Sequence, residues 1–149
     1  MEIKMNALKG LEIARKKILF RPDINSPIDP VTKKIVNDNR LKKNAVTLKY
    51  MLENGAAVAL IAHQGDTQDY QNLIPLMEHA QKLTALTGHP VHYIDDVCGP
   101  AAIEAVKKLP AGEAIILGNL RYLGEELSTF SNFVKLSPEE MQSVWHVRK

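Results

Sequence analysis

Asp23 and Asn25 carry side chains that could bind a small, charged metabolite. They lie in the segment Arg21-Pro22-Asp23-Ile24-Asn25-Ser26-Pro27, directly after the apolar run Ile18-Leu19-Phe20. Because successive side chains of an extended chain point to opposite sides, Asp23 and Asn25 project to the same side. The two prolines of the segment fix the backbone dihedral φ around them. The plainer interpretation is an ordinary Asp/Asn/Pro turn after a strand.

Polar side chains also follow three further apolar runs of the chain. They are His63, Gln64, Gly65 and Asp66 after the second run, Asp95 and Asp96 after the third, and Asn119 and Arg121 after the fourth. In an open parallel sheet, ligands bind beyond the carboxyl ends of the strands, so these residues would share one crevice. Taken singly, each has a plainer explanation, such as a histidine at the rim of the core, an aspartate that caps a helix, or a solvated arginine.

The elements that must position these residues are short strands alternating with helices. The predicted strands are residues 17–20, 57–61, 91–94 and 114–117. Apolar residues at helical spacing predict helices around residues 41–52, 76–86 and 100–109, with Gly55 and Gly88 as stop signals. Residues 1–14 have a helix-compatible composition interrupted at Gly10, and residues 138–149 are predicted to be helical. This alternation predicts an α/β fold, a Rossmann-like three-layer sandwich with a mostly parallel sheet.

Composition limits the classes of protein and partner. The 149 residues suit one globular domain, and a formal net charge of +2 does not indicate nucleic-acid binding. The apolar stretch at residues 56–62 is too short to cross a membrane, and the first residues lack a secretory signal, so a cytoplasmic location is expected. Cys98 is the single cysteine, which excludes an internal disulfide. A buried structural thiol is predicted there rather than a reactive one.

The fingerprints of several common sites are missing. There is no Gly-x-Gly-x-x-Gly after the first predicted strand, no Gly-x-x-x-x-Gly-Lys-Ser/Thr and no Gly-x-Ser-x-Gly. Neither a dinucleotide site, a P-loop nor a serine hydrolase elbow is therefore indicated. The five histidines and one cysteine show no paired ligand spacing, so no metal site is predicted.

Four separate motifs stand in order along the chain. They are Arg21-Pro22-Asp23-Ile24-Asn25-Ser26-Pro27-Ile28-Asp29, Asn37-Asp38-Asn39-Arg40, Ala62-His63-Gln64-Gly65, and Asn119-Leu120-Arg121-Tyr122 followed by Glu125-Glu126. In order and spacing they resemble the N-terminal domain of phosphoglycerate kinase, particularly its archaeal forms. The connecting stretches at residues 47–56 and 93–102 read like the family's as well. The resemblance covers residues 17–122 strongly and residues 146–149 weakly.

The resemblance implies that residues 1–149 form the substrate-binding domain of such a kinase. In the family, the N-terminal domain binds 3-phosphoglycerate or 1,3-bisphosphoglycerate, and the C-terminal domain binds magnesium ATP or ADP. The complete enzyme transfers a phosphoryl group between 1,3-bisphosphoglycerate and ADP, giving 3-phosphoglycerate and ATP in glycolysis and gluconeogenesis. Carried over by motif, Asp23 and Asn25 would bind the hydroxyl and carboxylate region, and His63 and Arg121 the phosphate end. Arg40 would bind substrate and act as the catalytic arginine, stabilising charge on the transferring phosphoryl group.

Two positions depart from the family pattern. Where the family has Arg-Pro after the glycine of the third motif, this chain has Asp66-Thr67, which replaces a phosphate-binding cation with an anion. Where the family commonly has glutamate before the fourth motif, this chain has Gly118. The nucleotide-binding domain and a later substrate arginine are also absent from the 149 residues. The chain alone is therefore expected to bind substrate without turnover and to bind no cofactor.

Other functions are possible on these residues. Asp66 and Gly118 motivate a stand-alone, non-catalytic metabolite-binding or interaction domain whose site has diverged. A structural fragment without any ligand is a third interpretation. The helical pattern that stops at residues 138–149 favours a cut chain over a complete protein.

Overall fold

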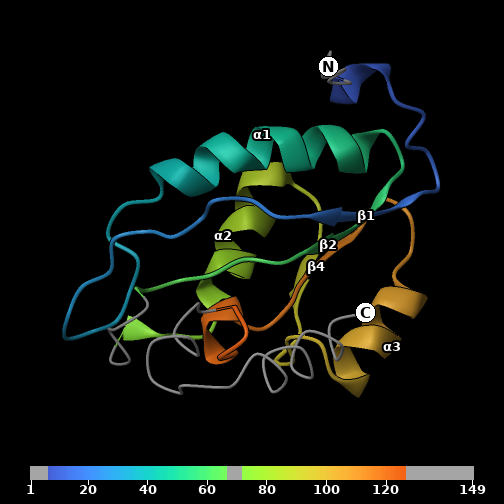
Figure 1. The fold of residues 1–149 in the computed structure, drawn as a ribbon. Helices are drawn as coiled ribbons and strands as arrows, with labels where there is room; N and C mark the ends of the chain where they lie inside the picture. The colour runs from blue at the N-terminus through green and yellow to red at the C-terminus, as the bar shows by residue number, and fades with distance from the viewer. Residues whose placement is uncertain (1–6, 67–71, 127–149) are drawn as a thin grey trace, which may run out of the picture.

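The computed structural model describes residues 7–66 and 72–126, which form a parallel sheet flanked by helices (Figure 1). The strands of this described part are β1 (Lys17–Phe20), β2 (Ala57–Leu60), β3 (Val91–Tyr93) and β4 (Ala114–Ile116), in the spatial order β1-β2-β4-β3. All of the predicted strands are confirmed. The last three end one residue earlier than predicted, although the N–H groups of Ile61, Ile94 and Leu117 still donate to a neighbouring strand.

The helices that connect these strands are α1 (Asn39–Glu53), α2 (Met77–Thr87) and α3 (Pro100–Lys108). The predicted stop signals are confirmed, because Gly55 and Gly88 follow α1 and α2 with φ of +75° at both glycines. Near the N-terminus, a short 3-10 turn, η1 (Leu8–Gly10), ends at Gly10, the residue that was expected to interrupt the helix-compatible segment. The predicted helix at residues 138–149 lies outside the described residues. Among the described residues, no helix is long and apolar enough to cross a bilayer.

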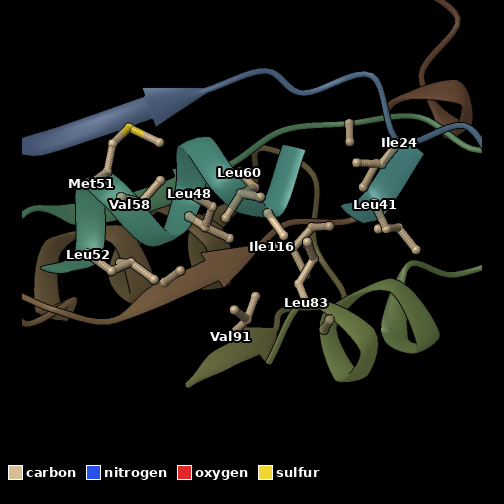
Figure 2. Close-up of a cluster of buried hydrophobic side chains, with 14 of the residues drawn as sticks. Ile24, Leu41, Leu48, Met51, Leu52, Val58, Leu60, Leu83, Val91 and Ile116 are labelled. Atoms are coloured by element: carbon tan, nitrogen blue, oxygen red, sulfur yellow. The ribbon is translucent and has the colours of Figure 1, made fainter. Parts of the chain in front are cut away.

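Helices pack on both faces of the sheet, which explains why every residue of β2 is buried. Val58 and Leu60 point toward α1 and α2, where they cluster with Leu48 (Figure 2). Ala59 points to the opposite face and packs near Ala102 of α3. Each large apolar side chain buried in this way contributes about 1.5–3 kcal/mol. The layering of helix, sheet and helix confirms the predicted α/β class.

The loop between β3 and α3 contains Asp96 and Cys98. The Asp96 carboxylate accepts hydrogen bonds from the N–H groups of Gly99 (2.8 Å) and Ala102 (3.0 Å), and these bonds lower its pKa. The cap interpretation of Asp96 is therefore confirmed. The prediction of a buried thiol is wrong, because Cys98 is exposed in the turn before α3, outside the packed faces of the sheet.

Candidate functional site

The carboxyl ends of β1, β2 and β4 lie side by side because these strands are parallel neighbours. Phe20 lies opposite Leu60, and Leu60 lies opposite Ile116. The residues predicted to bind a ligand leave the strands at this edge of the sheet: Asp23 and Asn25 after β1, His63 after β2, and Arg121 after β4. The strands alone therefore bring four of the predicted residues to one place.

Arg40 reaches the same edge from the first turn of α1. Its Nη1 atom lies 2.7 Å from both carboxylate oxygens of Asp23. Asn44, one turn further along α1, donates from Nδ2 to the backbone carbonyls of Asp23 (2.8 Å) and Arg40 (2.9 Å). The side chains of Arg40 and Asp23 are 51% and 65% exposed, so a ligand can reach both. An ion pair this exposed adds little to stability, and its importance is the placement of the guanidinium.

Burial alternates along the segment that follows β1. Ile24 is fully buried in the core, whereas Asp23 is exposed and Asn25 is half-buried. The predicted two-residue spacing therefore directs Asp23 and Asn25 away from the core. The Oδ1 atom of Asn25 accepts a hydrogen bond from the N–H of Gly65 at 3.1 Å. This bond fixes the amide of Asn25 and joins the loop after β1 to the loop after β2.

His63 lies among charged groups of three loops. Burial lowers the pKa of its imidazole below the usual value, and the positive charge of Arg121 lowers the pKa further. Asp23 opposes this effect, and Arg21 adds to it. The electrostatic contacts show that His63 lies near residues that follow β1 and β4. A lowered pKa keeps the imidazole neutral at pH 7, so that it can donate one hydrogen bond and accept another.

Arg121 lies in a 3-10 turn, η3 (Leu120–Tyr122), a few residues after the end of β4. Its backbone N–H donates to Oδ1 of Asn119 at 3.1 Å. Its side-chain Nε atom is buried and has no hydrogen-bond partner within the described ranges. Nearby, Arg21 forms an ion pair with Glu126, which ties the end of β1 to the loop after η3. The buried Nε–H of Arg121 is a donor suited to an anionic ligand.

Three polar residues that position the site escaped prediction of a role. Asn44 fixes Asp23, Gln64 is buried between the loops, and His79 of α2 is fully buried against Gln64. Gln64 was expected at the end of the second strand, but as a ligand-side residue and not as a buried link between loops. His79 also left a signal in the sequence. It stands three residues after Leu76 and so falls on the apolar stripe of a helix, where a polar side chain needs a partner.

The polar residues at the end of β3 do not join the site. Asp95 accepts a hydrogen bond from the hydroxyl of Tyr93 at 2.6 Å, and Asp96 caps α3. Asp66 is exposed in the loop after β2. A Cβ atom at Gly118 would lie 3.0 Å from Cγ2 of Val97, so close packing explains this glycine. Within residues 7–66 and 72–126, no group of three or more histidine, cysteine or acidic side chains could bind a metal ion.

Comparison with known proteins gives a consistent match. The family model for phosphoglycerate kinase matches residues 8–143. A phosphoglycerate kinase of Sulfurisphaera tokodaii is 36% identical over 148 residues, which are 99% of this chain and 34% of the relative. That of Methanothermobacter thermautotrophicus is 34% identical over 149 residues, again 34% of the relative. The crystal structure of phosphoglycerate kinase from Pyrococcus horikoshii matches with a TM-score of 0.77 and 36% identity, over 83% of this chain and 30% of that one. The chain thus spans about a third of the length of the curated relatives it matches.

Proposed function

Because the chain belongs to the phosphoglycerate kinase family and corresponds to its N-terminal domain, we propose that it binds 3-phosphoglycerate or 1,3-bisphosphoglycerate. The proposed site is the carboxyl edge of β1, β2 and β4. One observation carries the proposal: the predicted residues Asp23, Arg40, His63 and Arg121 converge at this edge, although they come from four separate segments.

The charges and hydrogen-bonding groups at this edge support a phosphorylated acid as ligand. Arg121 offers a planar guanidinium whose buried Nε–H lacks a partner in the described part of the chain. His63, neutral at pH 7, adds a donor beside it. Asn25 uses its Oδ1 to accept from Gly65, which leaves its Nδ2 to donate to a hydroxyl or carboxylate oxygen. Asp23 can accept a hydrogen bond from the substrate hydroxyl.

The proposed role of Arg40 is electrostatic. In phosphoryl transfer, negative charge is spread over the equatorial oxygens of the moving group, and a positioned guanidinium stabilises that charge without moving a proton. The carboxylate of Asp23 holds the guanidinium of Arg40, and the amide of Asn44 joins the backbone carbonyls of both residues. We assign catalysis, with ADP and 1,3-bisphosphoglycerate giving ATP and 3-phosphoglycerate, to the enzyme that contains the remaining two thirds of the family's length. Magnesium ATP or ADP would bind to that remainder and not to these 149 residues.

The proposed setting is the cytoplasm and its glycolytic pathway. Cys98 is a free, exposed thiol, which suits a reducing compartment. The small net charge of +2 gives no support for a nucleic-acid partner. The partner that the proposed reaction requires is a nucleotide-binding domain of the same family.

A second candidate function is a metabolite-binding domain whose site has diverged from phosphoglycerate. Asp66 favours it, because an exposed carboxylate follows the loop that carries His63. Gly118 gives it no support, because the contact with Val97 explains that residue. The two candidates differ in the ligand that they predict, and a titration separates them.

The decisive experiment follows backbone amide shifts of the 149-residue chain during titration with 3-phosphoglycerate. We expect saturable shifts around Asp23, Arg40, His63 and Arg121. Removing a charged hydrogen bond costs about 1.5–3 kcal/mol, so Arg121→Gln should weaken binding by roughly 10- to 100-fold. Arg15→Gln is the matched control, because Arg15 precedes β1 and its N–H bonds to Gly55 at the opposite edge of the sheet. The proposal fails if millimolar ligand leaves the site amides unmoved, or if both variants bind equally well.

A further inference from the structure

We propose that His79 is a positioning residue for the ligand site, acting through the side chain of Gln64 on the loops that carry Asn25, His63 and Arg121. The identity of the ligand, 3-phosphoglycerate, rests on the proposed function. His79 acts at one remove from the ligand, because its hydrogen bond is to the side chain of Gln64.

The side-chain amide of Gln64 pairs with the loop after β1 through two hydrogen bonds, as the backbones of neighbouring β-strands do. Its Oε1 atom accepts from the N–H of Ser26 at 2.9 Å, and its Nε2 atom donates to the Ser26 carbonyl at 2.9 Å. Both residues are buried. Ser26 is the neighbour of Asn25, and Gln64 is the neighbour of His63. A shift of this pair therefore moves two predicted site residues relative to each other.

Asn119 joins the same pair to the loop after β4. The N–H of Gln64 donates to Oδ1 of Asn119 at 3.2 Å, and Nδ2 of Asn119 donates to the Gln64 carbonyl at 2.9 Å. The same Oδ1 accepts from the N–H of Arg121, and the same Nδ2 donates to the carbonyl of Ile74 at 3.0 Å. Gln64 is thus the point at which three loops of the site meet, next to the segment that leads into α2.

His79 connects this meeting point to the core helix. It is fully buried, and its Nε2 atom lies 3.1 Å from Oε1 of Gln64. The two backbone bonds of Ser26 determine which end of the Gln64 amide is oxygen, so His79 must supply the hydrogen from Nε2. Burial lowers the pKa of His79 to about 4, although the Ile24 carbonyl near the ring opposes this in part. The ring is therefore neutral at pH 7 with its proton on Nε2, and it orients the Gln64 amide.

If His79 served only to pack the core, an apolar residue at this position would stabilise the protein more. His79 stands on the apolar stripe of α2 beside Ala80 and Leu83, where leucine would pack without desolvating an imidazole. A buried polar pair in this place specifies one arrangement of the groups it joins. Those groups carry the ligand residues, which is why we assign the pair to the site.

The test compares two variants of the full chain. His79→Leu removes the donor and keeps the bulk, whereas His79→Gln places an amide donor near the position of Nε2. We expect His79→Leu to weaken 3-phosphoglycerate binding roughly tenfold, the scale of one lost buried hydrogen bond, and His79→Gln to restore most of it. Leu83→Ala is the matched control, because it disturbs the core of the same helix without removing a hydrogen-bonding group, and it should leave affinity unchanged while lowering stability. Affinities are compared at a temperature at which all the variants are folded.

Spectroscopy gives a readout that does not need the ligand. Ring nitrogen shifts should show His79 as the Nε2–H tautomer at pH 7. In His79→Leu, the amide signals of Ser26 and Gly65 should shift and exchange faster with solvent, and in Leu83→Ala they should not. If the wild-type chain fails to bind 3-phosphoglycerate but these amides respond, the proposed function is wrong and the positioning role stands. Unchanged amides and unchanged affinity in His79→Leu would overturn the positioning role, as would an equal loss of affinity in Leu83→Ala.

Discussion

Acid should destabilise this protein through one buried residue, His79. Burial lowers the pKa of its imidazole from 6.5 to about 4 in the folded chain, whereas the unfolded chain exposes it to water. The unfolded state therefore binds a proton more tightly than the folded state. The stabilisation is complete above pH 6.5, decreases as the pH falls, and is lost below about pH 4.

The size of the effect follows from the two pKa values. The full difference corresponds to about 3 kcal/mol, since each pKa unit is worth about 1.4 kcal/mol. Between pH 7 and pH 5, the folded protein should lose about 2 kcal/mol of unfolding free energy through His79 alone. For a domain of this size, such a loss moves the urea midpoint by about 1 M.

The assay is urea unfolding followed by circular dichroism at several pH values from 7 to 4.5, on wild type and His79→Gln. Glutamine does not titrate, so the variant should lose about 2 kcal/mol less than wild type between pH 7 and pH 5. His63 also has a lowered pKa, and so do Asp29 and Asp96, but these groups titrate in both proteins and cancel in the comparison. Parallel stability curves for the two proteins would contradict this prediction, because they would show that His79 titrates alike in the folded and unfolded chains.

Two further predictions concern the loop after β2. Gly65→Ala should destabilise the protein by at least about 2 kcal/mol in thermal unfolding, because Gly65 has φ of +93° and a Cβ there would lie 2.7 Å from the Asn72 carbonyl oxygen. Gly112→Ala is the control, because Gly112 has φ of +82° and an added Cβ there would have no neighbour within 4 Å. It should lower the free energy of unfolding by only about 1 kcal/mol. Equal losses of stability in the two variants would mean that the contact with Asn72 does not matter. Asp66→Arg should strengthen 3-phosphoglycerate binding roughly tenfold by calorimetry, because it replaces an anion near a phosphate site with a cation. Glu53→Arg makes the same charge change at the far end of α1, and equal affinity in the two variants would show that Asp66 points away from the ligand.

The sequence was most informative where structure is local. Short apolar runs predicted the strands, and Gly88 predicted the end of α2, because periodicity and a left-handed residue are properties of short segments. The strand-end rule then placed Asp23 and His63 at one edge without any knowledge of their contacts.

Side-chain partners over long distances could not be predicted in the same way. The contact between Arg40 and Asp23 depends on how α1 crosses the loop after β1, and no local pattern encodes that crossing. The partner of His79 is similar: its place on the apolar stripe of α2 indicates burial, but the side chain that bonds the imidazole stands fifteen positions away at Gln64. The predicted burial of the Cys98 thiol was wrong because it rested on the usual burial of cysteine, whereas this cysteine lies in an exposed turn before α3.

The pairing of Asp23 with Arg40 changes what binding at this site means. A phosphate that reaches Arg40 finds the guanidinium already in contact with a carboxylate, and Arg21 is likewise paired with Glu126. At Arg40, binding then exchanges one anion for another, unlike at Arg121, whose Nε atom has no partner in the described part of the chain. The measured affinity is then the difference between the attraction of Arg40 for the phosphate and its attraction for Asp23. Ionic strength should weaken such an exchange less than the number of arginines at the edge suggests, because salt screens the outgoing partner as well as the incoming one.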